Sequence, residues 1–332
     1  MLGAFIGFGN VAAHGHLPGW LANPDVEIVA AADGAAGRRA VFEAACPKAR
    51  WFENPDDLLA ETTLDFVDIC TPPGSHEALI RRALGAGRHV LCEKPLVTGP
   101  SDGVAAAAAR AGRVLQTVHN WLEAPICRRI SALIGEGAIG AVHALHWQTL
   151  RIRPAVTVAS PGAANWRVVP AEAGGGILVD HGWHALYCML RWAGAAPESI
   201  AARLETRRHH EWPIEDTATM DLESPAWRAR IYLTWAADER SNKIEIEGER
   251  GRIHVEGESV ILATAPGERR WTCPPALSEG SHHPDWFAGV AADFLSAIRD
   301  GGQGNLAEAL LCARLIGLAQ RSSAAGGARF SV

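Results

Sequence analysis

Asp180 and His184 are the residues whose types and spacing point most directly to chemistry. They lie four positions apart, so a helix would place both side chains on one face. Gly174, Gly175 and Gly176 precede them, and glycines let the chain approach a flat ring closely. A histidine with an ordinary pKa of ~6.5 can pass a proton at neutral pH. The segment therefore fits a proton-transfer site, and the alternative is a structural hydrogen bond between the two side chains.

Lys94 supplies a cation of the kind that stabilises an alkoxide developing on a hydroxyl. It belongs to the turn 93–95 (EKP), which follows an expected strand at 89–92, and a second turn, 71–76 (TPPGSH), follows an expected strand at 66–70. In an open α/β sheet, ligands bind at the carboxyl ends of the strands, where both turns would lie. The alternatives are plain turn punctuation for the prolines and a solvated charged pair for the lysine and its glutamate.

The segment 7–12 (GFGNVA) follows an apolar stretch and opens a helical pattern, which is the context of a dinucleotide-binding fingerprint. Its first glycine permits a tight turn, its second lets the backbone approach a pyrophosphate, and the small third residue lets helix and strand pack closely. Asp33, 21 residues after Ala12, can accept hydrogen bonds from an adenosine ribose, and its charge would repel a 2′-phosphate. NAD is therefore favoured over NADP, while Arg38, which can accommodate that phosphate, argues the other way.

Metal sites and disulfides find little support in the sequence. The pattern DHxxH at 180–184 offers two histidines, but no third ligand accompanies them, and we predict no metal. The seven cysteines are an odd number and include no CxxC pair, which is typical of free thiols in a reducing compartment. We therefore expect a cytoplasmic protein.

The elements that must position these residues change character along the chain. The first third alternates short apolar runs at 3–7, 27–32, 66–70 and 89–92 with helical stretches at 11–22, 37–45, 76–86 and 102–111. Such alternation predicts βαβ units and a parallel sheet covered on both faces. From about residue 142 a period of two, clearest at 227–235, predicts strands with one packed and one wet face.

The expected fold class is α/β. We predict an N-terminal Rossmann dinucleotide-binding domain at 1–120 and a C-terminal α+β domain at 121–332 with a mostly antiparallel open sheet. Helical patterns at 285–299 and 306–322 close the chain.

Composition excludes several classes of protein. The 332 residues, with 48% hydrophobic and 20% charged side chains, suit a globular protein of one or two domains. Lysine and arginine number 31 against 37 acidic residues, the net charge is −6, and no dense basic run occurs, which argues against nucleic acid as a partner. No stretch approaches the ~18 apolar residues that span a bilayer, so we expect no membrane association.

The motifs as a set resemble the glucose-fructose oxidoreductase and inositol dehydrogenase family, Gfo/Idh/MocA. In order along the chain they are GFGNVA at 7–12, Asp33, TPPGSH at 71–76, EKP at 93–95, Trp166-Arg167 and GGGILVDHGWH at 174–184. The resemblance implies an NAD(P)-dependent enzyme that transfers a hydride between the nicotinamide and a secondary alcohol or ketone of a sugar, cyclitol or related polyol. It also implies a homo-oligomer, a dimer or tetramer, formed through the C-terminal sheet.

The resemblance further implies roles for individual residues. In such enzymes the lysine of EKP, here Lys94, contacts the reacting oxygen and the nicotinamide ribose, and the peptide before Pro95 is often cis. Asp180 and His184 face the nicotinamide with the histidine as proton carrier, so the implied catalytic residues are Lys94, Asp180 and His184. The expected cofactor contacts are Gly7, Phe8, Gly9, Asn10, Val11, Asp33, Arg38, Thr71, Pro72, Pro73, His76, Glu93 and Lys94. The expected substrate contacts are Lys94, Trp121, Trp166, Arg167, Asp180 and His184.

Two departures from the family pattern fall near the expected pocket. Many members show an aromatic residue followed shortly by an arginine after the first domain, whereas this chain has HNWL at 119–122. Tyr187 stands where a second aspartate is common. These positions would shape the substrate pocket.

Tryptophan is unusually abundant, with 12 residues. We predict a pocket walled by indoles that stack on a neutral pyranose or cyclitol, with Trp166 as the best candidate; the alternative is that these are core or interface aromatics. Two other functions stay open. One is a non-sugar reductase of the same family, acting on a trans-dihydrodiol or a biliverdin-like tetrapyrrole, and the other is a catalytically silent nucleotide-sensing protein.

Overall fold

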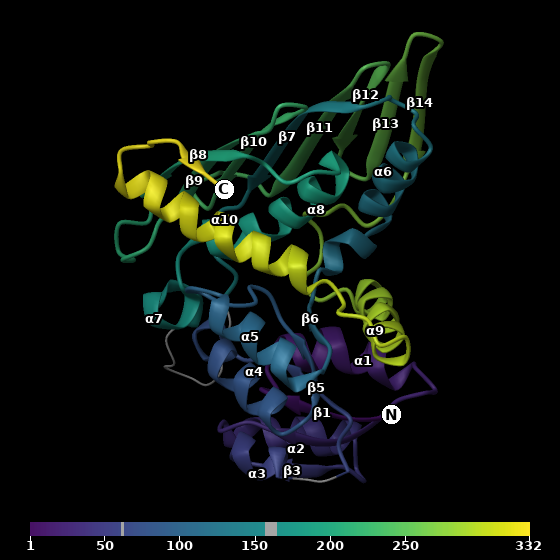
Figure 1. The fold of residues 1–332 in the computed structure, drawn as a ribbon, viewed down its shortest axis with the longest axis vertical. Helices are drawn as coiled ribbons and strands as arrows, with labels where there is room; N and C mark the ends of the chain where they lie inside the picture. The colour runs from purple at the N-terminus through teal and green to yellow at the C-terminus, as the bar shows by residue number, and fades with distance from the viewer. Residues whose placement is uncertain (61–62, 157–164) are drawn as a thin grey trace.

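The computed structural model describes residues 1–60, 63–156 and 165–332. It places them in two sheets at opposite ends of the molecule, with helices between them (Figure 1). The strands of the first sheet come from the N-terminal third of the chain, and those of the second sheet come from the remainder.

The first sheet has six parallel strands in the order β3-β2-β1-β4-β5-β6. The strands are β1 (Leu2–Ile6), β2 (Glu27–Ala32), β3 (Arg50–Phe52), β4 (Phe66–Ile69), β5 (His89–Cys92) and β6 (Leu115–Thr117). The connecting helices are α1 (Leu17–Leu21), α2 (Ala36–Ala45), α3 (Pro55–Leu59), α4 (His76–Gly85) and α5 (Asp102–Ala111). The strand order reverses between β1 and β4, and ligands of doubly wound sheets bind at this switch point. The predicted Rossmann sheet is confirmed.

The second sheet has nine strands in the order β14-β13-β12-β11-β7-β10-β9-β8-β15. The strands are β7 (Val142–Leu150), β8 (Ser199–Glu205), β9 (Thr217–Glu223), β10 (Arg228–Thr234), β11 (Ser241–Gly248), β12 (Gly251–Glu256), β13 (Ser259–Thr264), β14 (Gly267–Thr272) and β15 (Phe330–Ser331). Strand β10 runs parallel to β7, and the other pairs of described strands in this sheet are antiparallel. The predicted mostly antiparallel sheet is confirmed.

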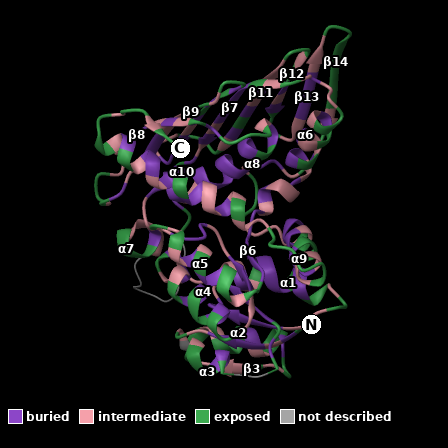
Figure 2. Ribbon diagram, viewed as in Figure 1, coloured by how far each residue is buried: buried purple, intermediate pink, exposed green. Residues whose placement is uncertain are grey.

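Helices cover one face of the second sheet. They are α6 (Pro125–Gly135), α8 (Trp183–Ala193) and α10 (Leu306–Ala324), which pack on β13, β7 and β8 respectively. The alternation in β10 follows from this packing, because Ala229 and Ile231 are buried while Arg228 and Arg230 are exposed. Figure 2 shows buried and less buried residues mixed along the strands of this sheet. The other face of the sheet carries polar side chains.

Helix α9 (Pro284–Arg299) comes from the C-terminal part of the chain but packs on the N-terminal part. The rings of Phe287 and Trp20 have centroids 5.3 Å apart, and those of Phe294 and Phe66 are 5.6 Å apart. These aromatics share one buried cluster with strands β1 and β4. The helix therefore ties the two sheets together and forms one wall of the space between them.

Two π-helical turns occur in the described part of the chain, one of them within the helical stretch predicted at 11–22. They are η1 (Ala12–His16), which precedes α1, and η5 (Leu178–Gly182), which precedes α8. Such turns occur frequently at functional sites, and both of these carry residues of the site described below. In the described part of the chain, no helix combines the length and apolar character needed to cross a bilayer.

Candidate active site

The glycine turn after β1 leaves room for a phosphate group. Gly7 has a φ of 84°, and a Cβ there would lie 2.7 Å from the Thr71 side chain, so the turn requires glycine. A Cβ on Gly9 would meet nothing within 4 Å, which leaves open space beside the backbone just before η1. The structure thus has the cradle that the fingerprint requires for a pyrophosphate.

Asp33 follows β2 and directs its carboxylate toward the same turn. Its Oδ2 accepts a hydrogen bond from the Phe8 amide at 2.7 Å, and its Oδ1 accepts one from the Ala35 amide at 2.8 Å. Each oxygen keeps a second lone pair, which fits a ribose hydroxyl. Arg38 donates to Asn10 Oδ1 at 3.0 Å, so the expected phosphate contact also lies beside the turn.

His76 joins the two turns at the edge of the parallel sheet. It is fully buried, with its ring nitrogens 2.8 Å from the carbonyl oxygens of Thr71 and Pro95. Pro73 is also buried, whereas Thr71 and Pro72 are partly exposed. His76 therefore holds the backbone that surrounds the expected cofactor position.

Lys94 and Asp180 form an ion pair between segments 86 positions apart in the sequence. Lys94 precedes a cis peptide to Pro95, as the resemblance implied. Its Nζ donates to the Asp180 carbonyl oxygen at 2.8 Å and to Asp180 Oδ1 at 3.0 Å, so the third ammonium hydrogen is left for a ligand oxygen. Burial would raise the pKa of Asp180, but Lys94 and His181 hold it well below its ordinary value, and the carboxylate is ionised.

His184 bonds to Tyr187 rather than to Asp180. Its Nδ1 lies 2.7 Å from Tyr187 Oη, which also accepts a hydrogen bond from the Trp121 amide at 3.0 Å. Because Oη already accepts from Trp121, its own hydrogen can be donated to Nδ1, and this leaves the imidazole hydrogen on Nε2. The ring stacks on Trp121 with centroids 4.4 Å apart. Burial and the nearby Lys94 cation lower the pKa of His184 well below its ordinary value, so the ring is neutral at pH 7.

A buried network around His16 was missed by the sequence analysis. His16 Nδ1 lies 2.9 Å from Asp68 Oδ2, and its Nε2 lies 3.0 Å from Glu93 Oε1. Burial favours the neutral ring, but the Asp68 carboxylate outweighs this effect and raises the pKa of His16 well above its ordinary value. Glu93 in turn accepts from the Lys94 amide at 2.9 Å, so the network supports the backbone of the lysine. The available signal was Asp68 itself, because a carboxylate within the apolar strand 66–69 needs a buried partner.

The same network contains a group of potential metal ligands. Ligand atoms of His16, Asp68 and Cys70 lie within 4.8 Å of one another. They already bond among themselves, with Cys70 Sγ 3.3 Å from His16 Nδ1 and 3.4 Å from Asp68 Oδ1, and Trp20 donates to Asp68 at 2.8 Å. Their donor atoms are therefore satisfied without a metal.

A cavity of about 460 Å³ opens where the Lys94, His184 and α9 segments meet. The sequence-predicted residues that line it are Val11, Glu93, Lys94, Trp121, Arg167, Asp180 and His184. Other lining residues, which the motifs did not indicate, include His16, Arg151, Arg153, Arg240, His282 and Trp286.

The tryptophans divide between cavity and core. Trp121 and Trp286 line the cavity, while Trp183 is fully buried and donates to His119 Nε2 at 3.1 Å. Trp166 is not among the described lining residues of this cavity; it lies against Arg167, whose guanidinium carbon is 4.3 Å from the indole centroid. The predicted stacking residue thus supports an arginine that faces the cavity.

A Rossmann sheet with a glycine cradle, and with Lys94, Asp180 and His184 in one cavity beside it, is typical of a dinucleotide-dependent oxidoreductase. Comparison with known proteins agrees with this class. Residues 2–119 match the oxidoreductase family with an NAD-binding Rossmann fold, and residues 127–254 match the GFO/IDH/MocA C-terminal domain. The chain belongs to the Gfo/Idh/MocA family of NAD-binding oxidoreductases, so the resemblance and the NAD prediction are confirmed.

The relatives are sugar oxidoreductases where their names specify a substrate. D-apiose dehydrogenase of Paraburkholderia graminis is 32% identical over 91% of this chain and 81% of that protein. Oxidoreductase P35 of Formosa agariphila is 29% identical, and the match covers 62% of this chain and 63% of that protein. A levoglucosan dehydrogenase in complex with NADH and levoglucosan shares the fold, with a TM-score of 0.86 at 20% identity, covering 100% of this chain and 99% of that one.

Proposed function

We propose that this protein transfers a hydride between NAD and a secondary alcohol or ketone of a sugar or cyclitol. The observation that carries the proposal is the Lys94–Asp180 pair, with a spare ammonium hydrogen, in one cavity with the neutral His184. The NAD pyrophosphate would bind at Gly9 and the residues that follow it, and the adenosine ribose would bind at Asp33. Bound NAD would supply the hydride acceptor, and the protein supplies orientation and proton transfer.

Lys94 and His184 divide the work on the substrate oxygen. The third ammonium hydrogen of Lys94 donates to that oxygen and stabilises its alkoxide character. His184 Nε2 takes the alcohol proton during oxidation and returns it during reduction. Oxidation requires the tautomer with the hydrogen on Nδ1, and Tyr187 Oη can accept that hydrogen once its hydroxyl rotates. Tyr187 is therefore a positioning residue for His184.

The direct test is absorbance at the reduced-nicotinamide band. Purified protein with NAD⁺ and a panel of sugars, alditols and cyclitols should form NADH with at least one of them. A protein that binds NADH tightly but turns over no member of the panel would contradict the proposal and favour a nucleotide sensor.

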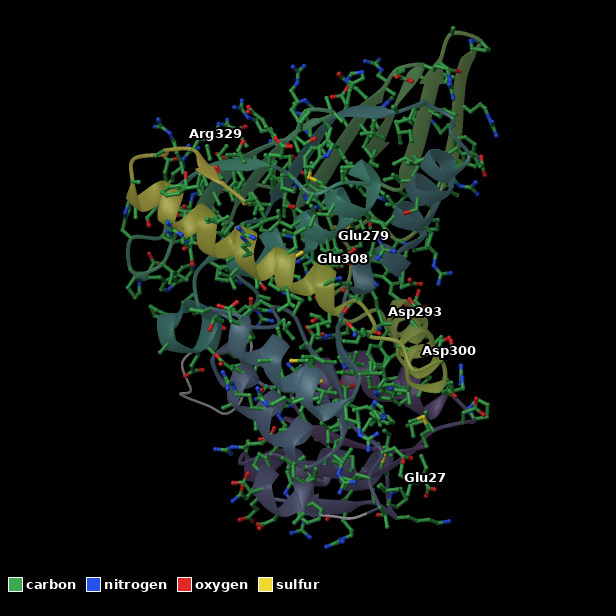
Figure 3. All side chains as sticks on the ribbon, viewed as in Figure 1. Glu27, Glu279, Asp293, Asp300, Glu308 and Arg329 are labelled. Carbon is green, nitrogen blue, oxygen red and sulfur yellow. The ribbon has the colours of Figure 1, made fainter. Side chains whose placement is uncertain are left out.

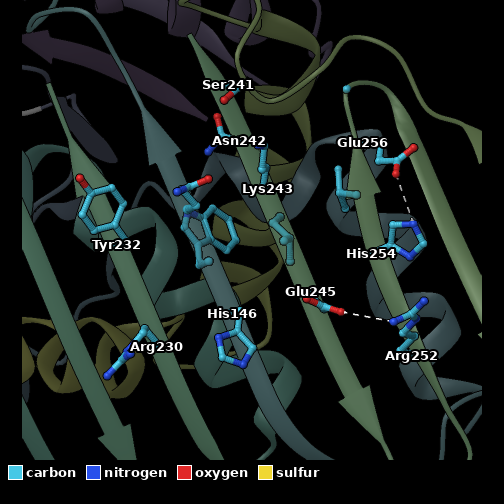
Figure 4. Close-up of a pocket in the computed structure, with 15 residues that line it drawn as sticks. His146, Arg230, Tyr232, Ser241, Asn242, Lys243, Glu245, Arg252, His254 and Glu256 are labelled. Atoms are coloured by element: carbon cyan, nitrogen blue, oxygen red, sulfur yellow. Dashed lines mark ion pairs between the residues drawn. The ribbon is translucent and has the colours of Figure 1, made fainter. Parts of the chain in front are cut away.

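We also propose a homo-oligomer, a dimer or tetramer, built on the open face of the second sheet. A hollow of about 790 Å³ lies on this face, with polar side chains from β7, β10, β11 and β12 (Figure 4). The described ion pairs there include Glu245 with Arg252 at 3.9 Å and Glu256 with His254 at 3.6 Å. Light scattering gives the oligomer size, and a monomer at micromolar concentration would contradict this proposal.

We further propose that the two domains comprise residues 1–120 and 121–332, and that the protein is located in the cytoplasm. The two family matches, which end at 119 and begin at 127, support the division. The seven cysteines are free thiols and six of them are buried, which supports a reducing compartment.

A further inference from the structure

The described residues that line the cavity carry more positive than negative charge. The cations are Lys94, Arg151, Arg153, Arg167 and Arg240, and the carboxylates are Glu93, Asp180 and Glu279. Two of the carboxylates already have partners, since Glu93 bonds to His16 and Asp180 bonds to Lys94. Glu279 is exposed on the loop before α9 (Figure 3). Three of the arginines, Arg151, Arg153 and Arg240, take part in none of the described ion pairs, so their charges receive little compensation from the described carboxylates.

Arg151 is the clearest case of a charge with little compensation. It follows β7 directly, is only 3% exposed, and takes part in none of the described ion pairs, although the Asp180 carboxylate is near enough to favour its charged form. Its Nη1 donates to the carbonyl oxygens of Leu150 at 2.8 Å and Ser241 at 2.9 Å, and its Nη2 donates to Asn242 Oδ1 at 2.8 Å. Burial and the Arg240 charge lower the pKa of Arg151 to about 9, so it is still a cation at pH 7.

The guanidinium of Arg151 has donors to spare. Of its five N–H groups, three are used in the bonds above, and Nε is buried with no partner in the described part of the chain. The unused donors therefore include Nε–H and one hydrogen of Nη2. A guanidinium that lines a cavity and has unused donors suits an anionic ligand group such as a carboxylate or phosphate.

Arg240 adds a second positive charge to the cavity lining without a carboxylate of its own among the described ion pairs. Its Nε donates to the Ser278 carbonyl oxygen, and its Nη2 donates to the Gly280 carbonyl oxygen at 3.0 Å. Arg240 also lowers the pKa of Arg151, so the two cations are close enough to repel each other. A buried charge without a counter-charge destabilises the free protein, and a bound anion would relieve that cost.

We propose that the substrate is an acidic sugar, whose carboxylate or phosphate binds the Arg151 and Arg240 wall while its reacting hydroxyl lies at Lys94 and His184. This inference rests on the proposed function and replaces the neutral polyol expected from the sequence. Lys94 follows strand β5 of the first sheet, whereas Arg151 follows β7 and Arg240 precedes β11 in the second sheet, so the acid group and the reacting hydroxyl would contact different segments of the cavity lining.

Calorimetry on NADH-loaded enzyme tests the proposal without requiring turnover. The matched probes are D-gluconate against D-glucitol and D-glucuronate against D-glucose, with D-glucose 6-phosphate separating a phosphate from a carboxylate preference. We expect at least one acid to bind about 10- to 100-fold more tightly than its neutral partner, the range for a hydrogen bond to a charged group. This difference in affinity between acid and neutral sugar should become smaller at high salt concentration. Equal binding of acids and neutral sugars, or no binding of any acid, would overturn the proposal.

Two arginine variants locate the binding. Arg151→Gln and Arg240→Gln should each remove about 10-fold or more of the preference for the acid. Arg208→Gln is the matched control, because Arg208 donates to the Ala237 carbonyl oxygen and to Asp238 but does not line the cavity. If Arg151→Gln does not fold, Arg240→Gln gives the same readout. A preference that survives in every folded cavity variant would overturn the proposal.

Turnover separates this inference from the proposed function. If acids bind through these arginines but form no NADH from NAD⁺, the acidic ligand is supported and the proposed dehydrogenase activity is contradicted. If neutral sugars are oxidised efficiently and acids are not preferred, the dehydrogenase activity is supported and the acidic substrate is overturned.

Discussion

Tyr187→Phe removes one oxygen atom from the centre of the candidate site. In the wild-type protein that oxygen lies 2.7 Å from His184 Nδ1 and accepts from the Trp121 amide at 3.0 Å. All three residues are buried, so phenylalanine leaves two polar groups without a partner. Each such group costs about 1–3 kcal/mol. We therefore expect the variant to be less stable by about 2–6 kcal/mol but still folded.

The kinetic effect of Tyr187→Phe should exceed what lost stability alone produces. Without Tyr187 Oη, His184 loses part of its orientation and the acceptor that its Nδ1–H needs during oxidation, and small misplacements of a catalytic group cost up to ~100-fold in rate. We expect kcat to fall about 10- to 100-fold at a temperature where the variant is fully folded. KM and the Kd for NADH should change by less than about threefold, because the hydroxyl contacts neither ligand in our mechanism.

The assay is steady-state kinetics with the best sugar from the panel, together with an NADH titration and thermal unfolding. Tyr232→Phe is the matched control, since Tyr232 is the other tyrosine of the chain and lies on the outer face of the second sheet (Figure 4). Unchanged kcat in folded Tyr187→Phe would refute the view that Tyr187 positions His184. A proportional loss of kcat and NADH affinity would indicate general distortion instead.

Three further predictions follow from the same geometry. Lys94→Met and His184→Gln should each lower kcat by at least ~100-fold while NADH binding stays within a few-fold, and near wild-type turnover in either variant would remove that residue from the mechanism. Calorimetry should show tighter binding of NADH than of NADPH, because the Asp33 carboxylate repels a 2′-phosphate. In Asp33→Asn the ratio of the two dissociation constants should fall by about 10-fold or more. The raised pKa of His16 stabilises the protein fully below its unfolded pKa of about 6.5, and this contribution is lost as pH rises through the folded pKa. His16→Gln leaves Asp68 its Trp20 hydrogen bond but removes its cationic partner, so the unfolding temperature of the variant should fall furthest below that of wild type at acidic pH. A constant difference in unfolding temperature between pH 6 and 9 would contradict a charged His16.

Local pattern was enough to predict most of the fold. The expected strand at 27–32 matches β2, the alternation at 227–235 matches β10, and the helix at 306–322 lies within α10. These elements are long enough for their sequence pattern to be recognised: a helical period of 3.6 residues, a strand period of two, or a short apolar run. Strands β3 and β6, of three residues each, carry too little pattern and were missed. The sequence also placed the glycine cradle and Lys94, because each lies directly after a predictable strand.

Only the tertiary structure decided which side chains meet. Periodicity tells which face of an element is buried, but it does not tell what that face is buried against. The spacing of Asp180 and His184 left a hydrogen bond between them open as an alternative, but the π turn η5 and the packing of α8 give them Lys94 and Tyr187 as partners. The net charge of −6 gave no hint of the cationic wall around Arg151, since that wall joins segments from distant parts of the chain. The sequence determined which reactive residue types follow which local elements. The electrostatic character of the cavity, in contrast, depends on how segments of the two sheets come together.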